Sequence, residues 1–418
     1  MTGPEHAAED RASRGRPRGA ADRVRLAQRQ VRWTLPLIAL FVAAGLSAAT
    51  LESRWATLHL LLAGATVLLI SAVSLMLTIT WSAAPAPPDT AVAIQRIAVS
   101  VGVAVLVTGH QTGAPSWVPI LGAAAYAAGL LLLAWQLVTT VRRGVERRYD
   151  VPVAGYAVAL LAGTVGAALG ADLLTNAPIT VRDAHRVLNL LGLVGIVIAS
   201  TLPFYVATVG RSKMSKAATP GRLITIVAVQ GLSVVVAVVG LLTSASAVAA
   251  AALLVDAACV ATTVALLPRP TRRQLEWAGP RLYGLWCGAA WWIVTIIVAA
   301  AQVLNGSSPL ADPWLAVLTV AAYGQIIWGS LAYLLPVVRG GGHKLLSAGF
   351  LLTRSWLGLV AANVVGVALV VGLGPAAIAA AAVWVLDTVV RFALLLRMRE
   401  APSPDAATTA GSRSPRGG

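Results

Sequence analysis

The sequence predicts an all-α, polytopic integral membrane protein with about twelve transmembrane helices. Two observations lead to this prediction. Apolar stretches long enough to cross a bilayer recur along the chain, and the basic residues between them alternate between one side and the other. The composition agrees, because 58% hydrophobic residues, 11% charged residues and a mean hydropathy of +0.79 describe a chain surrounded mostly by lipid.

Each predicted span has ~17 to 27 residues, the length at which a helix crosses ~30 Å of hydrocarbon. In chain order the spans cover residues 33–51, 58–81, 91–109, 116–141, 151–173, 183–209, 222–243, 246–268, 281–304, 313–338, 347–373 and 375–397. They form one transmembrane domain, residues 33–398. Residues 1–32 have little apolar periodicity and many arginines, so we expect a disordered cytoplasmic tail attracted to anionic lipid. Residues 399–418 are expected to form a second disordered cytoplasmic tail.

The basic residues predict the orientation in the membrane. If the first segment is cytoplasmic, the inner tails and connections hold 26 Lys and Arg, whereas the outer connections hold only Arg54, Arg182 and Arg186. This asymmetry predicts both termini in the cytoplasm. An error of one helix would scramble the alternation, so its regularity also supports the number twelve. The formal charge of +16 therefore reflects topology, and no nucleic-acid partner is expected.

The longest charged inner connections, residues 141–150 and 268–281, divide the chain into three blocks of four spans. The sixth and tenth spans both begin outside, contain glycines and finish with Leu-Pro, at 202–203 and 335–336. The second span shares only the outer start. Coincidence is the alternative, since any twelve spans divide into three fours. In the fifth span, Gly166 and Gly170 form a GxxxG pair that lets helices approach closely.

Polar side chains deep in a span are costly and each requires a reason. Asp387 and Arg391 are four residues apart, so they are expected to pair on one helix face. Asp256 has no partner on its own helix and is the best candidate for a proton-carrying group. In the alternative, Arg354 or Arg96 neutralises it across the bundle. The remaining polar residues in the spans are Gln230, Gln325 and Asn363.

Three histidines are predicted to lie at the outer side: His59 begins the second span, His110 ends the third and His185 begins the sixth. Two imidazoles at one depth can ligate haem iron, and three can hold copper. We therefore predict metal ligation by His59 and His185, with His110 as a weaker third candidate. Asp183 and Asn189 are near His185 as supporting polar groups. In the alternative, the histidines are only interfacial polar residues. His6 and His343 are expected to be cytoplasmic and solvated.

Several familiar signals are absent from the sequence. It has no Walker phosphate loop, CxxC pair, GxSxG elbow or HExxH helix, so ATP-driven transport and the common hydrolases lack support. Cys259 and Cys287 both fall inside predicted spans and form no disulfide framework.

Four segments carry a resemblance to a known family: LHLLLAGA (58–65), AHRVLNLLGLVGIVIASTLPFYVATVGRSKM (184–214), WGSLAYLLPVVRGGGHK (328–344) and RSWLGLVAANVVGV (354–367). They resemble the membrane module of actinobacterial copper-oxidase and copper-nitrite-reductase-like proteins. More distantly, twelve helices in three blocks are similar to subunit I of haem-copper oxidases and its NnrS-type relatives. Of the ligand positions in those oxidases, only His59 and His185 are matched, by helix number and depth.

The differences from these families narrow the classes of function that we expect. The last twenty residues lack Cys, His and Met, so no cupredoxin copper site follows, and Gln325 stands in a span where haem-copper oxidases have a ligand. We therefore expect a standalone module of a multi-pass inner membrane protein, not an autonomous enzyme. It would bind haem or copper near its outer face and act in electron transfer or nitrogen-oxide metabolism with a separate cupredoxin or cytochrome.

Two other classes of function remain open from the sequence. One is a secondary transporter in which Asp256, Arg354 and Asn363 line a midplane pathway. The other is a structural or assembly partner in the membrane without a site of its own.

Overall fold

The computed structural model describes residues 19–398. In this range all regular structure is helical, and twelve helical stretches are long and apolar enough to cross a membrane. The predicted fold class, a multi-pass all-α membrane protein, is confirmed. The tail predictions for residues 1–18 and 399–418, together with His6, lie outside the described residues.

The helices fall into the three predicted blocks. The first contains α2 (Ala20–Arg32), α3 (Leu35–Thr50), α4 (Arg54–Leu58), η1 (His59–Thr66), α5 (Val67–Trp81), α6 (Asp89–Gln111) and α7 (Trp117–Arg142). The second contains α8 (Asp150–Asp172), η2 (Leu173–Thr175), α9 (Ile179–Val187), η3 (Leu188–Gly195), α10 (Ile196–Val209), α11 (Pro220–Leu242) and α12 (Ser246–Ala265). The third contains α13 (Arg272–Ala278), α14 (Pro280–Leu304), α15 (Trp314–Ala316), η4 (Val317–Gly324), α16 (Gln325–Arg339), α17 (His343–Leu352), α18 (Trp356–Val370) and α19 (Gly374–Arg397).

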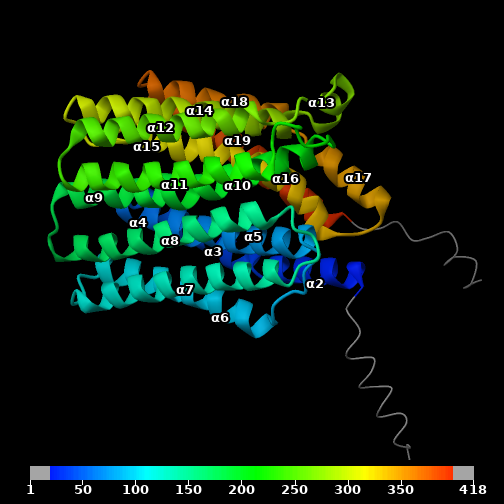
Figure 1. Ribbon diagram of the computed structural model, residues 1–418, viewed down its shortest axis with the longest axis horizontal. Coiled ribbons are helices and arrows are strands. Elements are labelled where there is room, and N and C mark those ends of the chain that lie inside the picture. Colours follow the sequence, from blue (N-terminus) through cyan, green and yellow to red (C-terminus); the bar gives the residue numbers. More distant parts are fainter. Residues whose placement is uncertain (1–18, 399–418) are drawn as a thin grey trace, which may run out of the picture.

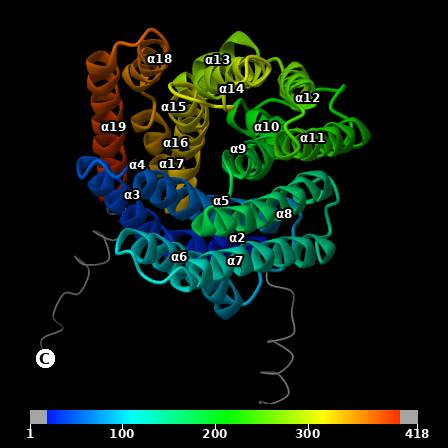
Figure 2. The same cartoon turned by 90° about the vertical axis from the view of Figure 1, so that its left-hand side faces the viewer.

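The long helices run side by side along one axis (Figure 1), and the two ends of the bundle differ. We call the end with α2, α13 and α17 the basic end, and the opposite end, where α4 and α9 lie, the histidine end. Seen from the histidine end, the helices form three groups around a centre (Figure 2). The second span of each block lies nearest that centre, where these spans line a mainly apolar cavity of about 100 Å³.

Each of these three central spans contains a π-helical segment of eight residues. The segments η1, η3 and η4 begin at His59, Leu188 and Val317, so each starts 129 residues after the one before. This common register confirms the threefold division and rules out coincidence. The Leu-Pro pairs do not share the register, because Pro203 follows the end of η3 by eight residues and Pro336 follows the end of η4 by twelve.

A π-helical turn disturbs the usual pairing of main-chain groups, and π segments are frequent at functional sites. Near the start of each segment a side chain donates a hydrogen bond to the carbonyl four residues earlier. These 2.8 Å bonds run from His59 to Trp55, from Asn189 to His185 and from Thr319 to Leu315. In addition, the Tyr323 hydroxyl of η4 donates to the Leu190 carbonyl of η3 across 2.8 Å. The π segments of blocks two and three are thus bonded to each other.

The prediction that residues up to 32 are disordered is wrong for its last part, since residues 20–32 form α2. The side chains of Ala27 and Val31 on one face are buried, and Gln28 Nε2 donates to the Val337 carbonyl of α16 at 2.8 Å. These contacts join α2 to α16, three hundred residues away, and to α5. Local apolar periodicity therefore did not reveal them.

The eleventh span is broken in two, which the sequence reading did not predict. The amphipathic α17 ends at Leu352 and α18 begins at Trp356, where the Ser355 hydroxyl accepts a hydrogen bond from the Gly358 amide and caps the new helix. Arg354 therefore lies in the break, where it donates to the Glu276 carbonyl of α13 at 2.6 Å. This places Arg354 at the basic end and not within the span.

The closest helix packing in the first block joins α6 and α7 through two glycines. A Cβ atom at Gly102 would lie 2.5 Å from the Tyr126 amide nitrogen, and one at Gly122 would lie 2.4 Å from that of Leu106. Because both contacts are with main chain, no side-chain rotation can relieve them. The two helices can approach this closely only with glycine at both positions.

Gly122→Ala should therefore force α6 and α7 apart and destabilise the bundle by about 1–3 kcal/mol. Gly221→Ala in α11 is the matched control, because a Cβ there meets nothing within 4 Å. Thermal unfolding in detergent measures both variants. Equal melting temperatures for the two would contradict the packing described for α6 and α7.

Candidate metal-binding site at the histidine end

His59 is the first residue of η1, and a main-chain hydrogen bond fixes its ring. Nδ1 lies 2.8 Å from the carbonyl oxygen of Trp55 on the preceding turn. A carbonyl oxygen can only accept, so Nδ1 carries the hydrogen and a neutral His59 has its lone pair on Nε2. An unprotonated Nε2 is the form of imidazole that binds metal ions.

His185 is fixed in the same tautomer by a different helix. Its Nδ1 lies 2.8 Å from the Gly166 carbonyl of α8. The amide of Asn189 is 3.3 Å from the same Nδ1 but donates to the His185 carbonyl at 2.8 Å. Because the Gly166 oxygen can only accept, Nδ1 is the donor and Nε2 is again left with its lone pair.

The GxxxG pair of α8 makes room for this arrangement. A Cβ atom at Gly170 would lie 2.8 Å from Cε1 of His185, and one at Gly166 would lie 2.5 Å from the Asn189 amide nitrogen. The two glycines therefore let His185 and Asn189 pack directly on the α8 backbone. Close helix approach, which the sequence predicted in general terms, here positions a candidate ligand.

The two imidazoles come from different blocks and lie side by side. Their ring centroids are 6.3 Å apart, and the ring planes differ by 23°. A metal ion bound by both rings, at ~2.0–2.1 Å from each nitrogen, would hold the centroids about 6 Å apart. The tautomers and the ring separation are compatible with a metal ion held by both rings, and ligation by His59 and His185 stays a prediction.

His110 is not a third ligand in this arrangement. The indole of Trp55 has its centroid 4.0 Å from the His59 ring and 4.0 Å from the His110 ring, so it contacts both. Within residues 19–398 no group of three or more His, Cys, Asp or Glu side chains could hold a metal ion. The predicted three-histidine copper site is therefore not formed, because an aromatic side chain occupies the space beside His59.

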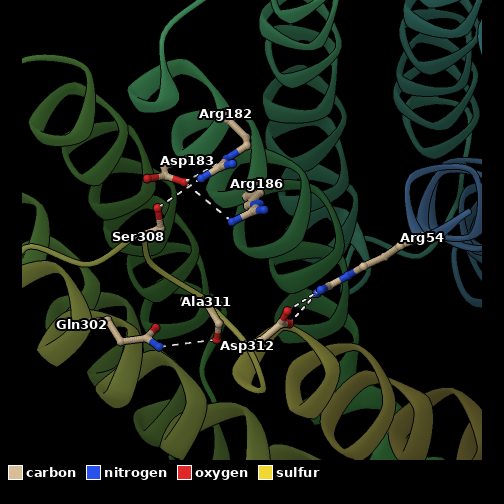
Figure 3. A network of polar contacts seen from close by, with 8 residues as sticks. All are labelled: Arg54, Arg182, Asp183, Arg186, Gln302, Ser308, Ala311 and Asp312. Carbon is tan, nitrogen blue, oxygen red and sulfur yellow. Dashed lines mark hydrogen bonds and ion pairs between the residues drawn. The ribbon is translucent and has the colours of Figure 1, made fainter. Parts of the chain in front are cut away.

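Charged side chains next to the histidines join all three blocks at this end (Figure 3). Arg54 of block one binds both carboxylate oxygens of Asp312 in block three. In block two, the Asp183 carboxylate lies 3.8 Å from Arg182 and 3.7 Å from Arg186, and Arg182 donates to Ser308 of block three at 3.4 Å. This network holds three guanidinium groups and two carboxylates, and Glu52 and Asp172 add two further carboxylates at the same end.

Four of the other predicted polar residues have structural partners. Arg391 Nε donates to Asp387 at 2.8 Å, which confirms the predicted pair. Asn363 accepts from Trp291 at 3.1 Å and donates to Gln325 at 3.1 Å, so these three side chains join α14, α16 and α18. The cysteines are free: Cys259 is buried in α12 and Cys287 is half-buried in α14.

The expectation that Arg96 or Arg354 neutralises Asp256 is wrong. Arg96 donates to the Gln30 carbonyl and the Thr34 hydroxyl at the junction of α2 and α3, and Arg354 is bound at the basic end. Asp256 is in no ion pair within residues 19–398. Asp256, Arg354 and Asn363 therefore contact different groups and do not form the pathway predicted for a transporter.

Sequence reasoning missed the groups that support the histidines. The acceptors for both rings are main-chain carbonyls, of Trp55 and Gly166, and not the side chains of Asp183 or Asn189. A carbonyl leaves no signal in residue identity. The Trp55–His59 spacing of four residues was the one available sign that the two rings share a helix face.

Comparisons with protein-family models, with curated proteins and with solved structures gave no match to this chain. The resemblance to copper-oxidase membrane modules therefore stays a prediction, and the case for a site depends on the geometry above.

The Arg54–Asp312 pair predicts a pH dependence of stability. The hydrogen bond from Arg54 lowers the pKa of the Asp312 carboxyl below its ordinary value of 3.8, and the charges of Arg54 and Arg186 act in the same direction. A lowered pKa in the folded state stabilises the fold above pH 3.8, and this contribution is lost as the pH falls through the folded pKa.

Asp312→Asn should therefore lower the melting temperature slightly at neutral pH, since exposed ion pairs contribute roughly 0–1 kcal/mol. The difference from the unmodified protein should vanish in acid. Asp22→Asn is the control, because its partner Arg25 lies 3.2 Å away on the same helix and joins no blocks. A difference that persists at low pH would show that Asp312 acts otherwise.

Proposed function

We propose that this multi-pass membrane protein binds haem iron between His59 and His185 and transfers electrons to or from a separate soluble redox protein. The observation that carries the proposal is the pair of facing blocks, each presenting an imidazole whose Nδ1–H is bonded to a carbonyl. His59 and His185 would hold the iron, and the haem would supply one-electron transfer.

The chain's own residues would do three things for such a group. His59 and His185 would hold the iron, while the carbonyls of Trp55 and Gly166 keep both rings oriented. Arg182 and Arg186, which share the single carboxylate of Asp183, would attract the carboxylates of the haem. Two imidazoles fit haem better than copper here, because the third histidine predicted for copper is separated by Trp55.

The distribution of basic residues indicates which side of the membrane the site faces. Within residues 19–398, nineteen Lys and Arg before, between and after the spans belong to the basic end, which favours a cytoplasmic position for that end and for both termini. The histidine end would then face the outside of the cell membrane. A soluble cupredoxin or cytochrome on that side is the class of partner that such a haem would serve.

Haem binding is tested by expressing the full chain with haem supplied and recording the visible spectrum of the purified protein. We expect a Soret band with the sharp reduced bands of six-coordinate haem, lost in both His59→Ala and His185→Ala. His343→Ala at the basic end and His110→Ala should keep the band. Gly170→Ala, which pushes on the His185 ring, should weaken haem affinity about 10–100-fold.

Metal analysis of the same preparations separates the alternatives. If the protein contains copper in place of iron, and both alanine variants lose it, then His59 and His185 form the site but the bound metal is copper. A colourless, metal-free protein, or a Soret band that survives both alanine variants, would refute the proposal.

A further inference from the structure

A second group of polar side chains lies in the middle of the bundle, away from the histidines. Asp256 is the eleventh of the twenty residues of α12, and Gln230 is the eleventh of the twenty-three residues of α11. Trp292 lies midway along α14. The exposed fractions of the three residues are 1%, 0% and 0%. All three therefore lie near the middle of their helices and are enclosed by the surrounding helices.

Within residues 19–398, none of the polar side-chain atoms of this group makes a hydrogen bond, although Gln230 lies against Asp256. Both carboxyl oxygens of Asp256, both amide atoms of Gln230 and the indole nitrogen of Trp292 are unpartnered. Each such buried group costs roughly 1–3 kcal/mol if left unsatisfied. Five such atoms lie near the middle of three helices, of which α12 packs against both α11 and α14, and this indicates a bound polar ligand.

The surroundings limit what that ligand is. Gln230 of α11 faces the Asp256 carboxyl. The titratable side chains near this carboxyl are Tyr323 of η4 and Cys259 of α12. The Tyr323 hydroxyl is already used, since it donates to the Leu190 carbonyl at 2.8 Å. No Lys, Arg or His among residues 19–398 pairs with Asp256, and an unpaired carboxylate in such a place would cost far more than a neutral acid.

We propose that Asp256 is a proton-binding site inside the membrane, whose carboxyl is neutral, bonded to water together with Gln230 and Trp292, and in exchange with protons of the solvent. Water supplies both donors and acceptors, and five open groups provide the two to four partners that a buried water needs. The site does not depend on the metal at the histidine end. A monovalent cation held by an ionised Asp256 is the competing outcome of the test.

Infrared spectroscopy of the full chain in a detergent without ester groups tests the proposal. The unmodified protein at neutral pH should show the carbonyl stretch of a protonated carboxyl, which moves to lower frequency after transfer to heavy water. Asp256→Asn should remove this band. Asp387→Asn is the matched control and should keep it, because Asp387 is ion-paired with Arg391 at 2.8 Å.

A second variant, Gln230→Leu, tests the proposal if Asp256→Asn does not fold. It retains Asp256 but removes the amide that faces it, so the band should shift and remain. The proposal is overturned by an absent band at neutral pH, by a band that added sodium abolishes, by one that heavy water never changes, or by one that Asp387→Asn removes instead.

Discussion

The structure depends on the requirement that every main-chain polar group within hydrocarbon be bonded inside the protein. Regular α-helices meet this requirement alone, but the three π segments, 129 residues apart, do not follow the usual pairing. Side chains near their starts donate to carbonyls of the preceding turn, and one of these side chains is His59. The Trp55 carbonyl accepts from both the main-chain amide and the Nδ1 of His59, and the second bond fixes the tautomer of a candidate metal ligand.

Contacts at three depths hold the central spans together. At the histidine end Arg54 binds Asp312, in the middle Tyr323 binds the Leu190 carbonyl, and at the basic end Gln28 binds the Val337 carbonyl. Each of these contacts joins two different blocks. His59 and His185, which belong to different blocks, are thereby kept at a centroid separation of 6.3 Å without touching a third ligand. Rigid support of this kind is what a preorganised site requires.

Hydropathy and charge were sufficient to predict twelve spans, three blocks, the shared end of the three histidines and the Asp387–Arg391 pair, because each depends on helix length or on neighbours four residues apart. Features set by distant chain segments could not be predicted this way. The helix α2 packs against α5 and bonds to α16, Arg96 finds its partners at the junction of α2 and α3, and Trp55 separates His110 from His59. A π segment differs from an α-helix by one extra residue in a turn, and a single extra residue does not produce a recognisable hydrophobic pattern in the sequence.

The central claim is that main-chain carbonyls hold His59 and His185 with hydrogen on Nδ1 and the lone pair on Nε2. Solid-state NMR of metal-free protein labelled with ¹⁵N-histidine measures this most directly, with signals assigned by their loss in His59→Ala and His185→Ala. The account predicts a protonated Nδ1 and a bare Nε2 for both residues at neutral pH. Protonated Nε2 in either ring, or charged rings like that of a solvated histidine, would contradict it.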